Sequence, residues 1–216
     1  MRKKIEKADK LPNPLSTIKA IPENLPFVLP ADLPSSDDGS TKEFELEVMS
    51  SSALQEDTLQ DVLRIFEENM GELYRISTWG LNLDEKAEEL RHRKARYLIV
   101  WTKQDKEEEA ESRKMAAFVH YRFCFDDDER PDWAVLYVYE IQVADGFQRK
   151  GLGQALMLLL QEVARQTQMT KVMLTVFNQN VEGMKFYRER CGYAVDDSDP
   201  SNYDERADYT ILSKTV

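Results

Sequence analysis

The sequence is poor in cysteine and histidine. In 216 residues there are two of each. Cys124 and Cys191 lie far apart with no metal-type spacing, and neither His92 nor His120 has other metal ligands beside it. We therefore expect no metal site, and a chain that works in its reduced form inside the cell.

Long apolar runs and an excess of basic charge are also missing. No run reaches the roughly 18 apolar residues of a membrane helix, and the first ten residues lack the apolar centre of a signal peptide. Lys and Arg number 29 against 40 Asp and Glu, a formal net charge of −11. Because nucleic-acid binders usually carry a basic face, we expect neither membrane nor direct nucleic-acid contact. A basic partner fits the charge, although solubility alone also explains it.

Proline divides the chain into two parts. Six of the eight prolines lie between Pro12 and Pro34. Since proline fixes φ and removes a backbone donor, residues 1–41 are predicted to be an irregular proline-rich segment, which could lie packed on the rest of the protein. Residues 42–216 are predicted to form one domain, a length typical of single domains.

Hydrophobic periodicity predicts an α/β (α+β) protein. Alternating or continuous apolar residues predict strands, and apolar residues at helical spacing predict helices. The predicted strands are 44–48, 96–101, 115–125, 134–143, 172–177 and 209–213, and the predicted helices are 59–76, 84–94, one starting at 151, and 180–190. The order β-α-α-β-β-β-α-β-α-β describes a mixed central sheet with helices on both faces.

The most informative segment lies where the strand 134–143 runs into a helix. The turn reads QRKGLG over residues 148–153. Its glycines allow close approach of a ligand, and the free N–H groups at a helix start form an anion site. Arg149 and Lys150 add positive charge, so the turn could hold a pyrophosphate. Neither GxxxxGK[ST] nor GxGxxG is present, and a lone GxG is equally compatible with a plain strand–helix turn.

The wider pattern resembles the Gcn5-related N-acetyltransferase superfamily. QRKGLG after a strand is similar to its Q/R-x-x-G-x-G/A signature. The downstream residues NVEGMKFY (180–187) and then Gly192-Tyr193 resemble its next helix and strand. The resemblance covers roughly residues 42–216. It implies the fold of that superfamily, with acetyl-CoA as cosubstrate and no metal.

Further segments resemble the NatD family of N-alpha-acetyltransferases. These segments are LYVYEIQV, QRKGLG, TQMTKVMLTVFNQN, DDSDPS, DYTILSK and NMGELYRISTWG. The resemblance implies direct transfer of acetyl, in a ternary complex, to the free N-terminal amine of histone tails that begin Ser-Gly-Arg-Gly. It also implies a monomer without an auxiliary subunit, contact with the ribosome during synthesis, and a location in cytoplasm and nucleus.

The resemblance also implies a set of cofactor-binding residues. Main-chain groups at the end of the strand would grip the pantetheine arm, the turn would bind the pyrophosphate, and an asparagine would contact the arm. These residues are Ile141, Gln142, Val143, Arg149, Lys150, Gly151, Leu152, Gly153, Gln154 and Asn180. For Ile141 and Val143, core packing is an additional role.

Glu140 is the predicted general base. A carboxylate in an apolar strand is costly unless it is paired, so residue type alone leaves a structural ion pair and catalysis about even; the resemblance favours catalysis. An α-amine has a pKa of about 8 against about 10.4 for lysine, so an N-terminus needs little help from a base. Tyr139 is predicted to position substrate or water, with sheet packing as the alternative. Tyr187 resembles the tyrosine that faces the leaving thiolate in some superfamily members.

The substrate residues implied by the resemblance are aromatic and acidic: Tyr74, Trp79, Tyr139, Thr175, Tyr209, and an acid for the substrate arginine, with Asp126 preferred to Asp128. The run DDDE at 126–129 is otherwise ordinary solvated charge.

Two alternative functions remain open. One is a lysine side-chain acetyltransferase of the same fold, and the other is a non-catalytic module that binds basic histone tails.

Overall fold

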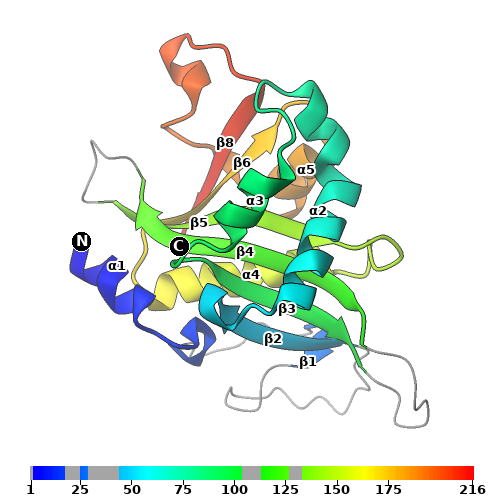
Figure 1. The fold of residues 1–216 in the computed structure, drawn as a ribbon. Helices are drawn as coiled ribbons and strands as arrows, with labels where there is room; N and C mark the ends of the chain where they lie inside the picture. The colour runs from blue at the N-terminus through cyan, green and yellow to red at the C-terminus, as the bar shows by residue number, and fades with distance from the viewer. Residues whose placement is uncertain (1, 18–24, 29–43, 104–112, 127–132) are drawn as a thin grey trace.

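The fold is an alternation of strands and helices, shown in Figure 1 as a computed structural model that describes residues 2–17, 25–28, 44–103, 113–126 and 133–216. The helices are α1 (Arg2–Asp9), α2 (Glu56–Ile76), α3 (Leu83–Leu90), α4 (Leu152–Gln166) and α5 (Val181–Lys185), which a π-helical turn (Phe186–Arg190) extends. The strands are β1 (Phe27–Val28), β2 (Phe44–Ser50), β3 (Arg96–Thr102), β4 (Met115–Phe125), β5 (Ala134–Val143), β6 (Lys171–Phe177), β7 (Ala194–Val195) and β8 (Tyr209–Thr215). Short 3-10 turns occupy Pro14–Thr17, Ser51–Ala53 and Pro200–Tyr203.

The strands form one mixed sheet in the order β1-β2-β3-β4-β5-β6-β8-β7. The pairs β1–β2 and β5–β6 are parallel, and the other pairs are antiparallel. Helices α2 and α3 cover one face, while α1 and α4 lie on the other (Figure 1). The predicted mixed sheet with helices on both faces is therefore confirmed. In the described part of the chain, no helix is both long and apolar enough to cross a membrane.

Strand β3 shows how the two cores arise from one sequence pattern. Leu98 and Val100 join the core that contains α1 and α4. Tyr97, Ile99 and Trp101 join the core beneath α2 and α3. Since successive side chains of a strand point to opposite faces, a strand between two helical layers must be apolar throughout. The continuous run YLIVW follows from this position.

The sheet opens between β5 and β6. Their parallel pairing runs from Val135 opposite Lys171 to Val138 opposite Leu174 and stops there. Beside this point the register between β4 and β5 shifts, so that Tyr139 is the extra residue of a bulge. A bulge bends its strand and increases the local twist. Strand β5 continues to Val143 beside β4, while β6 continues to Phe177 beside β8.

The prediction of irregular structure for residues 1–41 is wrong for Arg2–Asp9, which form α1. Ile5 and Ala8 are buried in the core shared with α4. The buried guanidinium of Arg96 donates hydrogen bonds to carbonyl oxygens at the end of this helix, 3.3 Å to Ala8 and 2.8 Å to Leu11. A helix of two turns is marginal by itself, so these tertiary contacts hold it in place. The predicted boundary at residue 42 lies outside the described residues.

Candidate active site

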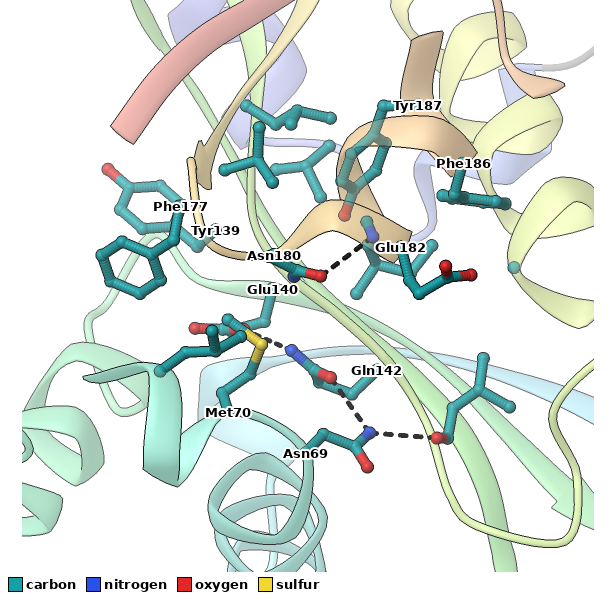
Figure 2. Close-up of a pocket in the computed structure, with 18 of the residues that line it drawn as sticks. Asn69, Met70, Tyr139, Glu140, Gln142, Phe177, Asn180, Glu182, Phe186 and Tyr187 are labelled. Carbon is teal, nitrogen blue, oxygen red and sulfur yellow. Dashed lines mark hydrogen bonds between the residues drawn. The ribbon is translucent and has the colours of Figure 1, made fainter. Parts of the chain in front are cut away.

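A cavity of about 880 Å³ lies where β5 and β6 separate. Its walls come from α2, α3, β5, β6, the turn into α4, and α5 with its π-helical extension. In Figure 2, Asn69 and Met70 of α2 lie on one side of Glu140, and Asn180 and Tyr187 lie on the other. This volume falls within the range of about 300–1,000 Å³ that is usual for small-molecule sites.

Most of the predicted cofactor residues meet in this cavity. Those that line it are Ile141, Gln142, Val143, Arg149, Gly151, Leu152, Gly153, Gln154 and Asn180. Lys150 is not among the lining residues. Its ammonium lies 5.8 and 5.6 Å from the ring centroids of Phe44 and Phe147. The structure thus brings together the strand end, the turn and the asparagine that the sequence placed far apart.

The turn into α4 has the geometry of an anion site. Gly151 is the residue before the first turn of α4, with φ 82° and ψ −5°. This left-handed conformation favours glycine, and the helix start behind it presents N–H groups that lack partners within the helix. A Cβ on Gly153 would lie 3.2 Å from the ring of Phe186, so the helix approaches the π-helical turn closely. Arg149 pairs with Glu182 at 3.0 Å, with both side chains largely exposed.

Glu140 lies buried in the middle of the cavity and is held by two donors. One carboxylate oxygen accepts a hydrogen bond from Lys86 Nζ at 2.9 Å, and the other accepts one from Gln142 Nε2 at 2.9 Å. Asn69 Nδ2 donates in turn to Gln142 Oε1 at 3.1 Å and to the Val143 carbonyl at 3.0 Å (Figure 2). The network ties β5 to both α2 and α3. The carboxylate is therefore paired, and it also lines the cavity.

Burial and pairing act in opposite directions on this pair of charges. Burial raises the pKa of the Glu140 carboxyl, and the neighbouring Lys86 and Gln142 oppose that rise. Burial disfavours the charge on Lys86, but Glu140, Tyr74 and Glu89 outweigh it and raise the pKa of the ammonium. Lys86 therefore carries its positive charge, and Glu140 is a stronger proton acceptor than an exposed carboxylate.

Aromatic rings form the other end of the cavity. Tyr74 and Trp79 line it, and both pack edge-on against Phe177, with centroids 5.0 and 5.1 Å away. Tyr209 does not line the cavity but supports Trp79 at 5.4 Å. Trp79 nevertheless remains 51% exposed, so its ring also forms part of the entrance.

Two hydrogen bonds fix the entrance loop that carries Trp79. The Thr78 amide donates to Asp208 Oδ2 at 2.6 Å, and its hydroxyl bonds Oδ1 at 3.1 Å. The loop between α2 and α3 is thereby joined to the start of β8. Thr175 lines the floor below and hydrogen-bonds to the Tyr137 hydroxyl.

Tyr139 both packs in the sheet and lines the cavity. Its ring stacks on His120 at 4.8 Å, and the Arg122 guanidinium lies 4.2 Å from its centroid. Burial, with Arg122 and Lys86, lowers the pKa of His120 to about 2, so this histidine is neutral. Within the described residues, no three His, Cys, Asp or Glu side chains are grouped to hold a metal ion.

The structure corrects the position expected for Asp126. Its side chain is fully buried, with Oδ2 2.8 Å from Lys171 Nζ, and it is not part of the cavity wall. Lys171 also pairs with Asp196 at 2.6 Å. A carboxylate that is buried here, away from the cavity wall, is not accessible to a substrate arginine bound in the cavity. The second choice, Asp128, lies outside the described residues.

Among the polar cavity residues that the sequence reasoning missed, three lie on α2 and α3: Asn69, Lys86 and Glu89. All three lie on helices that read as ordinary polar surfaces. One signal was available for Lys86, because Leu83, Lys86 and Leu90 fall at i, i+3 and i+7, which is one helix face. Tyr187, from the π-helical turn, does line the cavity, and burial raises its pKa.

The chain is similar to known proteins in both sequence and fold. The sequence profile of the acetyltransferase (GNAT) family matches residues 59–193. Ribosomal-protein-S18-alanine N-acetyltransferase from Escherichia coli has a TM-score of 0.50 at 19% identity, over 79% of this chain and 94% of that one. Ard1 from Thermoplasma volcanium has 0.53 at 16%, over 81% and 98%. PaiA N-acetyltransferase from Thermoplasma acidophilum, in complex with coenzyme A, has 0.51 at 13%, over 79% and 99%. These similarities show a shared fold, and because the profile spans more than half of its residues, the chain belongs to the acetyltransferase (GNAT) family.

Proposed function

We propose that the protein transfers acetyl from acetyl-CoA to the free N-terminal amine of histone tails that begin Ser-Gly-Arg-Gly. Family membership makes the chain an acetyltransferase with acetyl-CoA as its acetyl donor. The observation that carries the finer proposal is the position of Glu140. Its carboxylate lies in one cavity between the Gly151–Gly153 turn and the aromatic end formed by Tyr74 and Trp79.

The proposed reaction needs few protein groups. The substrate amine forms a C–N bond to the acetyl carbon while the C–S bond breaks, and coenzyme A leaves with the electron pair of that bond. Glu140 takes the proton that the amine loses, directly or through one water. The amides at the start of α4 hold the pyrophosphate, and the free main-chain edge of β5 after Val138 positions the pantetheine arm.

An N-terminal amine suits this site better than a lysine. Presenting the neutral form at pH 7 costs an α-amine about 1.4 kcal/mol and a lysine about 4.6 kcal/mol, from their ordinary pKa values. The aromatic end is braced by the hydrogen bonds from Thr78 to Asp208. A substrate Cβ at the second position would approach Tyr74 or Tyr139, which favours glycine there.

The substrate arginine needs a carboxylate at the aromatic end, and Asp126 is buried elsewhere. Glu89 lines the cavity beside Lys86 and keeps 32% of its side chain exposed. We assign the arginine contact to Glu89 for this reason. A charge-assisted hydrogen bond contributes about 1.5–3 kcal/mol, which corresponds to roughly 10–150-fold in affinity.

The proposal also covers the class of substrate, the location in the cell and the oligomeric state. The Escherichia coli relative is by name an N-acetyltransferase for a ribosomal protein, so the fold serves protein substrates. Acting on nascent histones would place this enzyme beside the ribosome and in the cytoplasm and nucleus. We also propose that it works as a monomer, as the resemblance to the NatD family implies.

The test measures coenzyme A release with a Ser-Gly-Arg-Gly peptide and with the same peptide acetylated at its N-terminus. We expect release with the first only, and mass spectrometry should place the acetyl group on the α-amine. Glu140→Gln should bind acetyl-CoA normally but turn over about 10²–10⁴-fold more slowly. Acetylation of internal lysines, or equal rates on peptides beginning Met-Leu or Ala-Ala, would exclude the proposed substrate. Parental turnover by Glu140→Gln would exclude the base.

A further inference from the structure

Lys86 is a buried ammonium fixed between two carboxylates. It lies on α3, and its side chain is only 8% exposed. The ammonium is 2.9 Å from Glu140 Oε1 and 2.8 Å from Glu89 Oε1. The rings of Phe66 and Tyr74 lie beneath it, with centroids at 4.7 and 5.3 Å. A long flexible side chain is here held on four sides.

We propose that Lys86 is a positioning residue that keeps the buried Glu140 carboxylate ionised and turned toward the cavity, which rests on the proposed role of Glu140 as the base. A carboxylate that is buried without a partner takes up a proton instead of remaining charged. A protonated carboxyl cannot accept the proton of the substrate amine. Lys86 therefore decides whether the base is available at neutral pH.

The other groups around Glu140 do not replace this charge. The titratable neighbours are Tyr74 on α2, Glu89 on α3, His120 opposite Glu140 on β4, and Tyr187 on the π-helical turn. His120 is neutral, because burial lowers its pKa. Glu89 is negative and opposes the ionisation of Glu140. Gln142 contributes a neutral hydrogen bond, so the cation that contacts the carboxylate is Lys86.

Stability alone does not account for such a pair. Buried ion pairs often contribute nothing relative to well-packed apolar residues of the same size, because removing both charges from water is costly. Helix α3 nevertheless holds Lys86 firmly. Asn82 caps the helix by accepting hydrogen bonds from the amides of Asp84 and Glu85 at 3.1 and 3.2 Å, and Leu90 anchors its other end in the core. The energetic cost of burying this ion pair is explained if the charge of Lys86 serves the reaction.

The charge state of Glu140 can be read directly by NMR. The protein is labelled with glutamate carrying carbon-13 in the side-chain carboxyl, and the Glu140 signal is assigned by its loss in Glu140→Gln. In the parent protein with coenzyme A bound, we expect an ionised carboxylate at pH 7. Removing an opposite charge at this distance raises a carboxyl pKa by about 1–3 units. Lys86→Met should therefore move the Glu140 titration upward by about that amount.

Two matched variants separate this effect from general damage. Glu89→Gln removes a negative charge beside the same ammonium and should move the Glu140 titration downward, opposite to Lys86→Met. Lys86→Arg retains the charge and should leave Glu140 ionised at pH 7. The pH at which kcat is half-maximal, measured with one peptide, should shift in the same directions. A general loss of packing would not produce shifts of opposite sign.

The outcomes that overturn the proposal do not depend on the substrate. A Glu140 carboxyl that is protonated at pH 7 in the parent protein excludes it, even if Lys86→Met fails to fold. So does an unchanged titration in Lys86→Met, or an upward shift in Glu89→Gln. If Glu140 titrates as expected but the peptide is not acetylated, the role of Lys86 in ionising Glu140 stands and the proposed function fails.

Discussion

Gly151 offers the cleanest perturbation of the turn into α4, where we propose that the pyrophosphate of acetyl-CoA binds. Its φ of 82° is left-handed, and a Cβ built there would meet nothing within 4 Å. Gly151→Ala therefore adds strain in the backbone conformation without a steric clash. Gly146 is a matched control in the same turn between β5 and α4. Its φ is 81°, its surroundings are equally open, and it does not line the cavity.

The size of the effect follows from the backbone geometry. A residue with a Cβ loses about 1–2 kcal/mol in the left-handed conformation. In an open turn the chain can relax to a negative φ, which turns the amides at the start of α4 away from the cavity. Binding of the pyrophosphate must then restore the strained conformation. A cost of 1–2 kcal/mol weakens acetyl-CoA binding by roughly 5–30-fold for Gly151→Ala.

Isothermal calorimetry with acetyl-CoA measures this directly. We expect Gly146→Ala to change the Kd by less than about twofold, because its backbone strain lies away from the ligand. Both variants should have similar melting temperatures, within a few degrees of the parent, since 1 kcal/mol corresponds to about 2–4 °C at this chain length. Unchanged affinity in Gly151→Ala, or an equal loss in both variants, would refute the assignment of the pyrophosphate to this turn.

Three further predictions concern other parts of the molecule. Arg96→Met should destabilise the protein by about 2–4 kcal/mol and increase amide exchange in α1, because buried carbonyls at the end of that helix lose their donor; unchanged exchange would contradict this reading. Burial disfavours the charge of Asp196, but hydrogen bonds from Lys171, Ser213 and Ser198 outweigh it and lower its pKa from 3.8 to about 2. Its stabilisation is thus present above about pH 4 and lost toward pH 2, so denaturant unfolding of Asp196→Asn should depend less on pH across that interval. Trp79→Ala should raise the peptide KM roughly 2–12-fold, the value of an aromatic contact, without changing acetyl-CoA affinity. A loss of acetyl-CoA affinity in this variant would assign the ring to the cofactor and not to the peptide.

The fold was predictable where one physical signal dominates. Strand β3 is apolar throughout because both its faces are covered, and α4 shows an apolar stripe where it packs in the core. The turn at Gly151 was recognisable because glycine and a helix start occur together after a buried strand. These signals are local, and each can be read within about fifteen residues.

Features that depend on distant partners were not predictable in the same way. Helix α1 has eight residues and a mostly charged sequence, and it is held by Arg96 and the core beneath α4. Asp126 was expected at the site because it belongs to an acidic run after a strand. Its actual partner, Lys171, begins a strand that is not adjacent to β4 in the sheet. Charge in a sequence does not indicate whether the side chain faces water.

Residue type alone does not distinguish an ion pair from catalysis at Glu140, because its partner is distant in the sequence. Its partner Lys86 is 54 residues away and lies on a helix whose other acidic and basic residues are mostly exposed. Pairing and catalysis are usually alternatives, because an ion pair satisfies a charge and makes it unavailable for proton transfer. In this cavity the lysine meets one carboxylate oxygen and Gln142 the other, while the carboxyl group still borders the open volume. A buried base needs a negative charge that persists away from water, and an ion pair of this kind stabilises that charge. In the proposed mechanism, the ion pair is therefore a condition for catalysis by Glu140.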